Sequence, residues 1–196
     1  MKKSMLVASV AATTLVASLA HANDAFGPEN AISIRSSVPL LSFVHTKPGA
    51  GDAINEFAIG PKMTLTSFAV DYWITKDVTL GGALQYGSRS AAPESWSMSL
   101  APSLGYRYAM GDITLWPKIQ PYYNYTSTTV ATVESTTSRV GIGVELPFLY
   151  SRGSFFYGPV VAAQFDVSST TKTGGNSSDG PMDTIIGAGF QLGSTF

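Results

Sequence analysis

The sequence predicts an all-β protein, an eight-stranded antiparallel up-and-down transmembrane β-barrel. Three observations support this fold class. Apolar residues alternate with small or polar residues along eight segments of about ten or more residues, the length that a tilted strand needs to cross a bilayer. The connections between these segments are alternately short and long. Aromatic residues gather near both ends of the segments.

The N-terminus has the features of a secretory signal peptide. Lys2 and Lys3 precede a run of apolar and small residues, and Ala20 and Ala22 supply the small residues that a signal peptidase needs. The alternative is a transmembrane anchor, but the run is shorter than the ~20 apolar residues of a spanning helix. We therefore expect residues 1–22 to be a signal peptide and residues 23–196 to form the barrel domain. The chain has no cysteine, which excludes disulfides.

The first four predicted strands each have one apolar face. They cover residues 31–44, 57–74, 78–87 and 96–108. Their apolar residues are Ile32, Ile34, Val38 and Leu40; Phe57, Ile59, Met63 and Leu65; Val78, Leu80, Leu84 and Tyr86; Trp96, Met98, Leu100 and Leu104. In the second strand the apolar face changes side after Thr66, as a β-bulge would cause. Pro39 is tolerable in the first strand if it lies at a bulge or an unpaired position.

The last four predicted strands show the same alternation. They cover residues 113–125, 139–150, 154–167 and 183–196. Their apolar residues are Ile113, Leu115, Ile119 and Tyr123; Val140, Ile142, Val144 and Leu146; Phe155, Tyr157, Val161 and Phe165; Ile186, Ala188, Phe190 and Leu192. The opposite faces are small or polar, as a strand with one wet face requires.

Short and long connections alternate along the chain. Those after the second, fourth and sixth strands are short, at residues 75–77, 109–112 and 151–153. Those after the odd-numbered strands are long and polar, at residues 45–56, 88–95, 126–138 and 168–181. Membrane barrels have short periplasmic turns and longer outer loops. We therefore expect extracellular loops and two periplasmic termini.

The aromatic residues form two predicted girdles. Those near the short turns are Tyr72, Trp73, Tyr106, Tyr108, Phe148, Tyr150, Phe155, Tyr157 and Phe196. Those near the long loops are Phe43, Phe57, Tyr86, Trp96, Tyr123, Tyr125 and Phe165. Two membrane interfaces select such girdles. The alternative is a soluble eight-stranded barrel, but its outer face would be charged, whereas the polar faces here are rich in Gly and Ser.

Three stretches resemble a known family. The segment 57–61, the hairpin 72–82 and the closing strand ending at Phe196 are similar to those of small outer-membrane β-barrels of the OmpA-like and opacity type. The resemblance implies a Gram-negative outer-membrane protein without a periplasmic domain. It also implies contact with outer-membrane lipid and lipopolysaccharide, and a closing strand that the barrel-assembly machinery reads. We expect a monomer.

Charged residues on the small or polar faces are predicted to lie in the lumen. They are Arg35, Lys62, Asp71, Arg107, Lys118, Arg139, Glu145 and Asp166. Counting from the turns places Arg35, Asp71 and Arg107 near the periplasm. It places Lys118 and Glu145 at mid-barrel and Arg139 opposite Asp166 near the long loops. Because an eight-stranded barrel has room only for side chains, these charges must pair or be hydrated.

The composition excludes several function classes. The formal net charge of −1 and the absence of a basic patch exclude nucleic acid as a partner. No metal-ligand spacing is present, so we expect no cofactor. His45 could form a catalytic group with Ser88 or Ser90 and Glu94, but no His-x-Ser motif occurs, and we expect no enzyme. Three functions remain: a structural barrel with a plugged lumen, a narrow porin-like pore for small solutes, or a surface adhesion or ligand-binding protein acting through its loops.

Overall fold

The computed structural model describes residues 27–49, 51–59, 66–89, 93–130 and 132–196, and these residues form strands and connections only. The strands are β1 (Ile32–Lys47), β2 (Ile54–Ile59), β3 (Thr66–Trp73), β4 (Val78–Arg89), β5 (Glu94–Tyr106), β6 (Tyr108–Met110), β7 (Ile113–Leu115), β8 (Lys118–Val130), β9 (Val133–Arg152), β10 (Phe155–Thr173), β11 (Asn176–Asp179) and β12 (Met182–Thr195). No helix in these ranges is long and apolar enough to cross a membrane.

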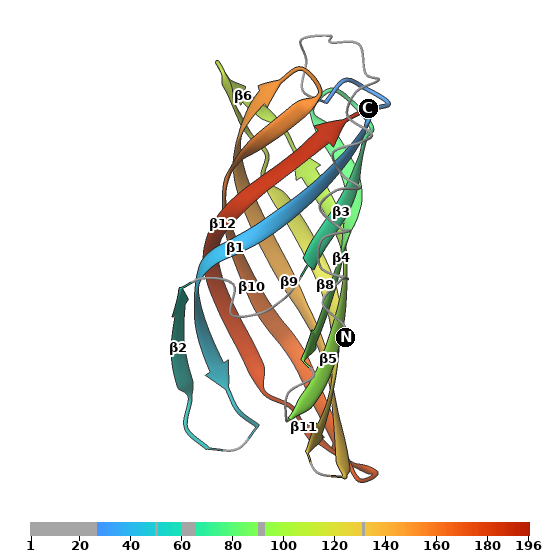
Figure 1. Ribbon diagram of the computed structural model, residues 1–196, viewed down its shortest axis with the longest axis vertical. Helices are drawn as coiled ribbons and strands as arrows, with labels where there is room; N and C mark the ends of the chain where they lie inside the picture. The colour runs from blue at the N-terminus through green and yellow to red at the C-terminus, as the bar shows by residue number, and fades with distance from the viewer. Residues whose placement is uncertain (1–26, 50, 60–65, 90–92, 131) are drawn as a thin grey trace, which may run out of the picture.

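Eight strands close into a barrel (Figure 1). In order around the wall they are β1, β3, β4, β5, β8, β9, β10 and β12, and every neighbouring pair is antiparallel. The closing strand β12 returns to β1, with Ser33 opposite Thr195 and Lys47 opposite Met182. The predicted fold class is confirmed. The predicted signal peptide and the predicted bulge near Thr66 fall at least partly on residues outside the described ranges.

The two faces of the wall differ as predicted. Leu80, Leu100 and Ile119 point outward with half or more of their surface exposed, whereas Thr79, Ser99 and Gln120 beside them are buried in the lumen. Exposed aliphatic side chains cover the whole height of the wall, an arrangement that water disfavours and lipid accepts. The alternation therefore identifies the outer surface as the lipid-facing one.

Aromatic side chains point outward at both ends of the wall. Tyr157 lies at the centre of one group, with ring centroids 6.0 Å from Phe155, 6.2 Å from Tyr150 and 6.4 Å from Phe190. Trp96 and Tyr125 form a pair near the other end, with centroids 5.2 Å apart. One girdle assignment is wrong: Trp73 is fully buried and points into the lumen.

Two of the predicted long loops are largely strands. β8 and β9 continue to Val130 and from Val133, and β10 continues to Thr173 before it turns back into β11. Thr is β-branched and favours extended backbone, and its hydroxyl can bond across a ladder. Thr137 and Thr171 do so at 3.1 Å. The Ser/Thr-rich composition that predicted loops at 126–138 and 168–181 therefore builds tall hairpins instead.

Local breaks explain the other differences from the predicted strands. Pro117 has no N–H, and the predicted strand 113–125 is divided there into β7 and β8. β6 and β7 form a small hairpin closed at Gly111, whose φ is +62°. On β1 the register shifts between Pro39 and Leu41, so Pro39 lies at a bulge as predicted. β2 pairs only with the outer part of β1 among the described residues.

Candidate functional site

Three aromatic rings fill the lumen beside the short turns. Trp73 and Trp116 stack with centroids 5.1 Å apart and planes 21° apart, and Phe156 meets Trp116 edge-on at 6.0 Å. Each of the three is fully buried. The indole N–H of Trp73 donates to Ser33 Oγ at 2.7 Å, and that of Trp116 donates to Thr79 Oγ1 at 3.1 Å. We call these three residues the aromatic plug.

The aromatic plug was not predicted from the sequence, although the alternation of side chains along each strand places its two tryptophans in the lumen. Trp73 is two residues from Asp71, Trp116 is two residues before Lys118, and each pair therefore shares a lumen face. Glycines on neighbouring strands make room for the rings. A Cβ on Gly193 would collide with the Phe156 ring, and one on Gly105 would lie 2.8 Å from the indole nitrogen of Trp116.

Four charged side chains form an inner ion cluster next to the aromatic plug: Arg35, Asp71, Lys118 and Glu145. Asp71 Oδ2 accepts from Arg35 Nε at 2.8 Å and from Lys118 Nζ at 2.7 Å. Arg35 Nη1 donates to Glu145 Oε2 at 3.0 Å, and Ser103 Oγ donates to Asp71 Oδ1 at 3.1 Å. The two cations and two carboxylates balance, which buried charges require.

The inner ion cluster differs from the expected arrangement. Arg35 and Asp71 were expected near the periplasm and Lys118 and Glu145 at mid-barrel, yet all four meet at one level. Lys118 and Glu145 are direct register partners on β8 and β9, but Lys118 pairs across the lumen with Asp71 of β3, and Glu145 pairs with Arg35 of β1. The tilt and stagger of barrel strands bring positions of different depth together.

Cations cover both sides of the stacked indoles. Lys118 Nζ lies 3.2 Å from the ring centroid of Trp116, and the guanidinium carbon of Arg107 lies 5.6 Å from that of Trp73. Arg107 also pairs with Asp77 of the adjacent short turn at 3.3 Å. Cation–π contacts with desolvated rings contribute about 2 kcal/mol or more each. Arg107 is thus placed at the short-turn end, and the aromatic plug separates it from the inner ion cluster.

A second group, the outer ion cluster, lies toward the long hairpins and comprises Tyr122, Arg139, Asp166 and Asp183. Arg139 Nε is 3.7 Å from Asp166 Oδ2, and its Nη1 donates to Asp183. Tyr122 donates its hydroxyl to Asp166 at 2.6 Å. Arg139 was expected opposite Asp166. It instead faces Ser169 in register, because β10 has a bulge between Asp166 and Ser168.

Asp183 was missing from the predicted lumen charges, although it lies an even number of residues from buried Gln191 on the same strand and therefore on the same face. Lys62 lies outside the described residues.

His45 was considered as part of a catalytic group with Ser88 or Ser90 and Glu94. Its Nδ1 is 2.7 Å from Asn55 Oδ1 at an exposed site, and Ser90 lies outside the described ranges. Within those ranges no group of three or more His, Cys, Asp or Glu side chains could hold a metal ion.

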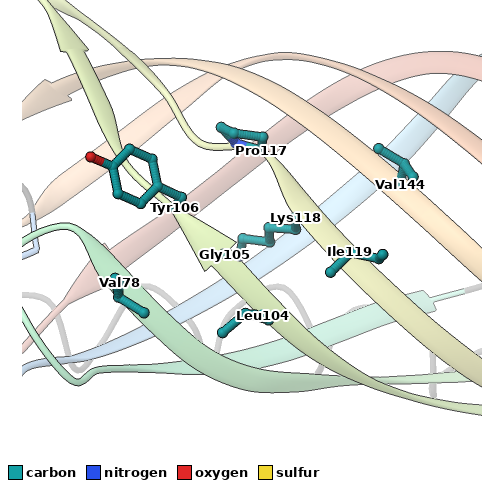
Figure 2. A pocket seen from close by; sticks show the side chains of 8 residues that line it. All are labelled: Val78, Leu104, Gly105, Tyr106, Pro117, Lys118, Ile119 and Val144. Atoms are coloured by element: carbon teal, nitrogen blue, oxygen red, sulfur yellow. The ribbon is translucent and has the colours of Figure 1, made fainter.

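A shallow groove crosses the outer wall where β5 and β8 lie side by side (Figure 2). Its lining comprises Val78, Leu104, Gly105, Tyr106, Pro117, Lys118, Ile119 and Val144. Lys118 contributes from beneath, because its ammonium group is bonded to Asp71 in the lumen. The groove therefore belongs to the apolar outer surface and has no set of convergent polar groups that could orient a substrate.

Comparisons with known proteins agree with the barrel. Neisserial surface protein A is similar in structure, with a TM-score of 0.55 and 12% identity, and the match covers 84% of this chain and 99% of that one. The outer membrane protein OprG from Pseudomonas aeruginosa matches with a TM-score of 0.50 and 10% identity over 88% of this chain and 98% of that one. No protein-family model and no curated protein matches the chain. At these identities the likeness concerns the fold.

Proposed function

We propose that this chain is a structural integral protein of a Gram-negative outer membrane, with a lumen closed by its own side chains. The observation that carries the proposal is the inner ion cluster backed by the aromatic plug. The cluster joins β1 and β3 to β8 and β9, which lie on opposite sides of the barrel. Its bonds of 2.7–3.0 Å therefore cross the lumen.

The charge balance favours a plugged lumen over a solute pathway. Five of the eight charged residues predicted for the lumen are Arg or Lys. In the structure Arg35 and Lys118 are matched by Asp71 and Glu145. A conducting path would have to break these buried pairs, and breaking a buried pair costs about 3–5 kcal/mol. The four residues act here as structural links rather than as a selectivity filter.

The refolded barrel is expected to leave a planar lipid bilayer silent. Reproducible small openings whose conductance changes in a Lys118→Ala variant would contradict the structural role and support a narrow pore. Migration that shifts on heating in an electrophoresis gel serves as the control, because it shows that the silent protein is folded.

The proposal includes an orientation and a set of partners. The short turns and both chain ends face the periplasm, and the β8–β9 and β10–β11 hairpins face the outside. Phe196 at the end of the closing strand is the residue that the barrel-assembly machinery recognises. Residues 1–22 direct export. The barrel is a monomer whose outer surface contacts lipid and lipopolysaccharide. The lipid-facing aromatic groups and the alternation of short and long connections support this orientation.

Epitope tags test the orientation. A tag inserted between Gly174 and Gly175 is expected to bind antibody on intact cells, because both residues lie in an exposed turn with φ of +55° and +88°. The matched tag at Gly153, in the turn between β9 and β10, should bind only after the outer membrane is permeabilised. The reverse result would show that the barrel has the opposite orientation in the membrane.

A further inference from the structure

The barrel closes at the seam between β1 and β12, the first and the last strand of the wall. The two strands lie side by side (Figure 1) and are the wall neighbours furthest apart in the chain. At the short-turn end, Ile32 and Phe196 bond to each other through both backbone N–H groups, at 3.0 and 2.8 Å. Chain ends are poorly ordered unless other contacts tie them down, so this end of the seam needs such contacts.

A chain of side-chain hydrogen bonds crosses the seam inside the lumen. Trp73 of β3 donates its indole N–H to Ser33 Oγ of β1 at 2.7 Å, and Ser33 Oγ lies 2.8 Å from Thr195 Oγ1 of β12. Ser33 and Thr195 are register partners next to the bonded residues Ile32 and Phe196. Ser33 and Trp73 have no exposed surface, and Thr195 is buried. A hydroxyl can accept one hydrogen bond and take part in another, so Ser33 joins the aromatic plug to the last strand.

The turn before β1 fixes the position of Trp73. The backbone N–H of Trp73 donates to Ala31 O at 2.9 Å, and its carbonyl accepts from Asn30 N at 2.8 Å. Gly27 has a φ of +71° and lies so close to the indole that a Cβ there would collide with the ring. Both the backbone and the ring of Trp73 are therefore held while its indole N–H is directed at Ser33.

The aromatic plug also contacts the other strand of the seam. Phe156 packs where Gly193 of β12 leaves room, since a Cβ on Gly193 would collide with the Phe156 ring. Gly193 is the register partner of Arg35 on β1. Ala31, just before β1, belongs to the same buried cluster as Trp73 and Phe156. The plug thus contacts both strands of the seam from the lumen side.

We infer that Ser33, Trp73 and Thr195 form a seam latch, which couples packing of the aromatic plug to closure of the barrel. Separating β1 from β12 at this end breaks the bond between two buried hydroxyls, and an unpaired buried polar group is unfavourable. Because Ser33 is also bonded to Trp73, the packed plug resists movement of β1. The seam latch is a conformational device beyond the structural role proposed above, and it operates whether or not the lumen conducts.

Amide hydrogen exchange tests the seam latch, because it reports how often a backbone hydrogen bond opens. NMR of the refolded protein in detergent micelles follows the exchange at Ile32 and Phe196. Ser33→Ala leaves the Trp73 N–H and the Thr195 hydroxyl without this partner, so both amides should exchange about ten-fold or more faster than in the unmodified protein. Thr195→Val breaks the seam bond from the β12 side and gives the same readout if Ser33→Ala does not fold.

Two controls separate the seam latch from a general loosening of the barrel. The amide of Tyr106 donates to Pro117 O at 3.0 Å, also toward the short turns, and should keep its exchange rate in Ser33→Ala. Thr79→Val is the matched variant. Fully buried Thr79 accepts from the other indole of the plug, that of Trp116, at 3.1 Å, but it lies on β4, which β3 separates from β1. It should leave exchange at the seam unchanged.

The double variant Ser33→Ala with Thr195→Val tests whether the two side chains act through one bond. Since Ser33→Ala already removes that bond, adding Thr195→Val should speed exchange at Ile32 and Phe196 by less than Thr195→Val does alone. Full addition of the two effects would mean that the side chains act independently.

Unchanged exchange at Ile32 and Phe196 in Ser33→Ala would overturn the seam latch. Equal acceleration at Tyr106, an equal effect of Thr79→Val at the seam, or full addition in the double variant would overturn it too. Conductance by the unmodified protein would remove the plugged structural role and leave these expectations as they stand.

Discussion

Asp71→Ala is expected to lower the free energy of unfolding by about 3–5 kcal/mol, because it removes the shared partner of two buried cations. Lys118 would lose the ion pair with Asp71, the only one that it forms among the described residues, at a side chain with no exposed surface. Arg35 would keep Glu145 but lose its 2.8 Å bond to Asp71. Urea-induced unfolding in detergent micelles or thin-chain vesicles measures the change.

Asp77→Ala is the matched control for Asp71→Ala. Asp77 also pairs with an arginine, but the Asp77 side chain is 32% exposed in a turn, and exposed pairs contribute about 0–1 kcal/mol. A double variant, Asp71→Leu with Lys118→Met, should recover much of the loss, since apolar groups of similar volume replace the charges. Equal losses for Asp71→Ala and Asp77→Ala would show that the inner ion cluster does not hold the lumen together.

Trp116→Ala is expected to destabilise the barrel by about 3–5 kcal/mol, the range for large aromatic truncations in a packed interior. Trp116 stacks on Trp73, meets Phe156 and lies under the ammonium group of Lys118. Its loss therefore removes packing from three neighbours at once. Equilibrium unfolding followed by the slower-migrating, unfolded gel band measures the effect.

Trp96→Ala serves as the comparison for Trp116→Ala. Trp96 is 42% exposed on the lipid-facing wall and has Tyr125 as its ring partner. Lipid can fill the space that Trp96 leaves, whereas the space left by Trp116 is enclosed by protein, so the loss should be smaller. If Trp96→Ala were the more damaging of the two, the barrel would depend on its girdle rather than on its aromatic plug.

The barrel was predictable because alternation has a strict period of two. A side chain such as Leu100 and its neighbours Ser99 and Ala101 must point to opposite faces of the wall, and only lipid accepts so many exposed aliphatic residues. Trp73 was wrongly assigned to the lipid-facing girdle, because it is aromatic and lies near a short turn. Parity with Asp71 would have placed it correctly.

The site was predictable in membership but not in pairing. Arg35, Asp71, Lys118 and Glu145 were all assigned to the lumen, because each is charged and lies on a small or polar face. Which side chains pair across a lumen depends on tilt, stagger and side-chain reach, so Lys118 pairs with Asp71 although Glu145 is its register partner. The hairpins were misread for another reason, because Thr and Ser occur in both flexible loops and extended ladders.

The stacked indoles give this protein an optical signal of its own. Trp73, Trp96 and Trp116 are its three tryptophans, and only Trp73 and Trp116 lie 5.1 Å apart at 21°. Two transition dipoles so close couple to one another, so the folded barrel should show an exciton couplet in circular dichroism that neither indole produces alone. Trp96 faces lipid, where brominated acyl chains quench its fluorescence. Membrane insertion and closure of the lumen can thus be timed separately in one refolding reaction, without any added dye.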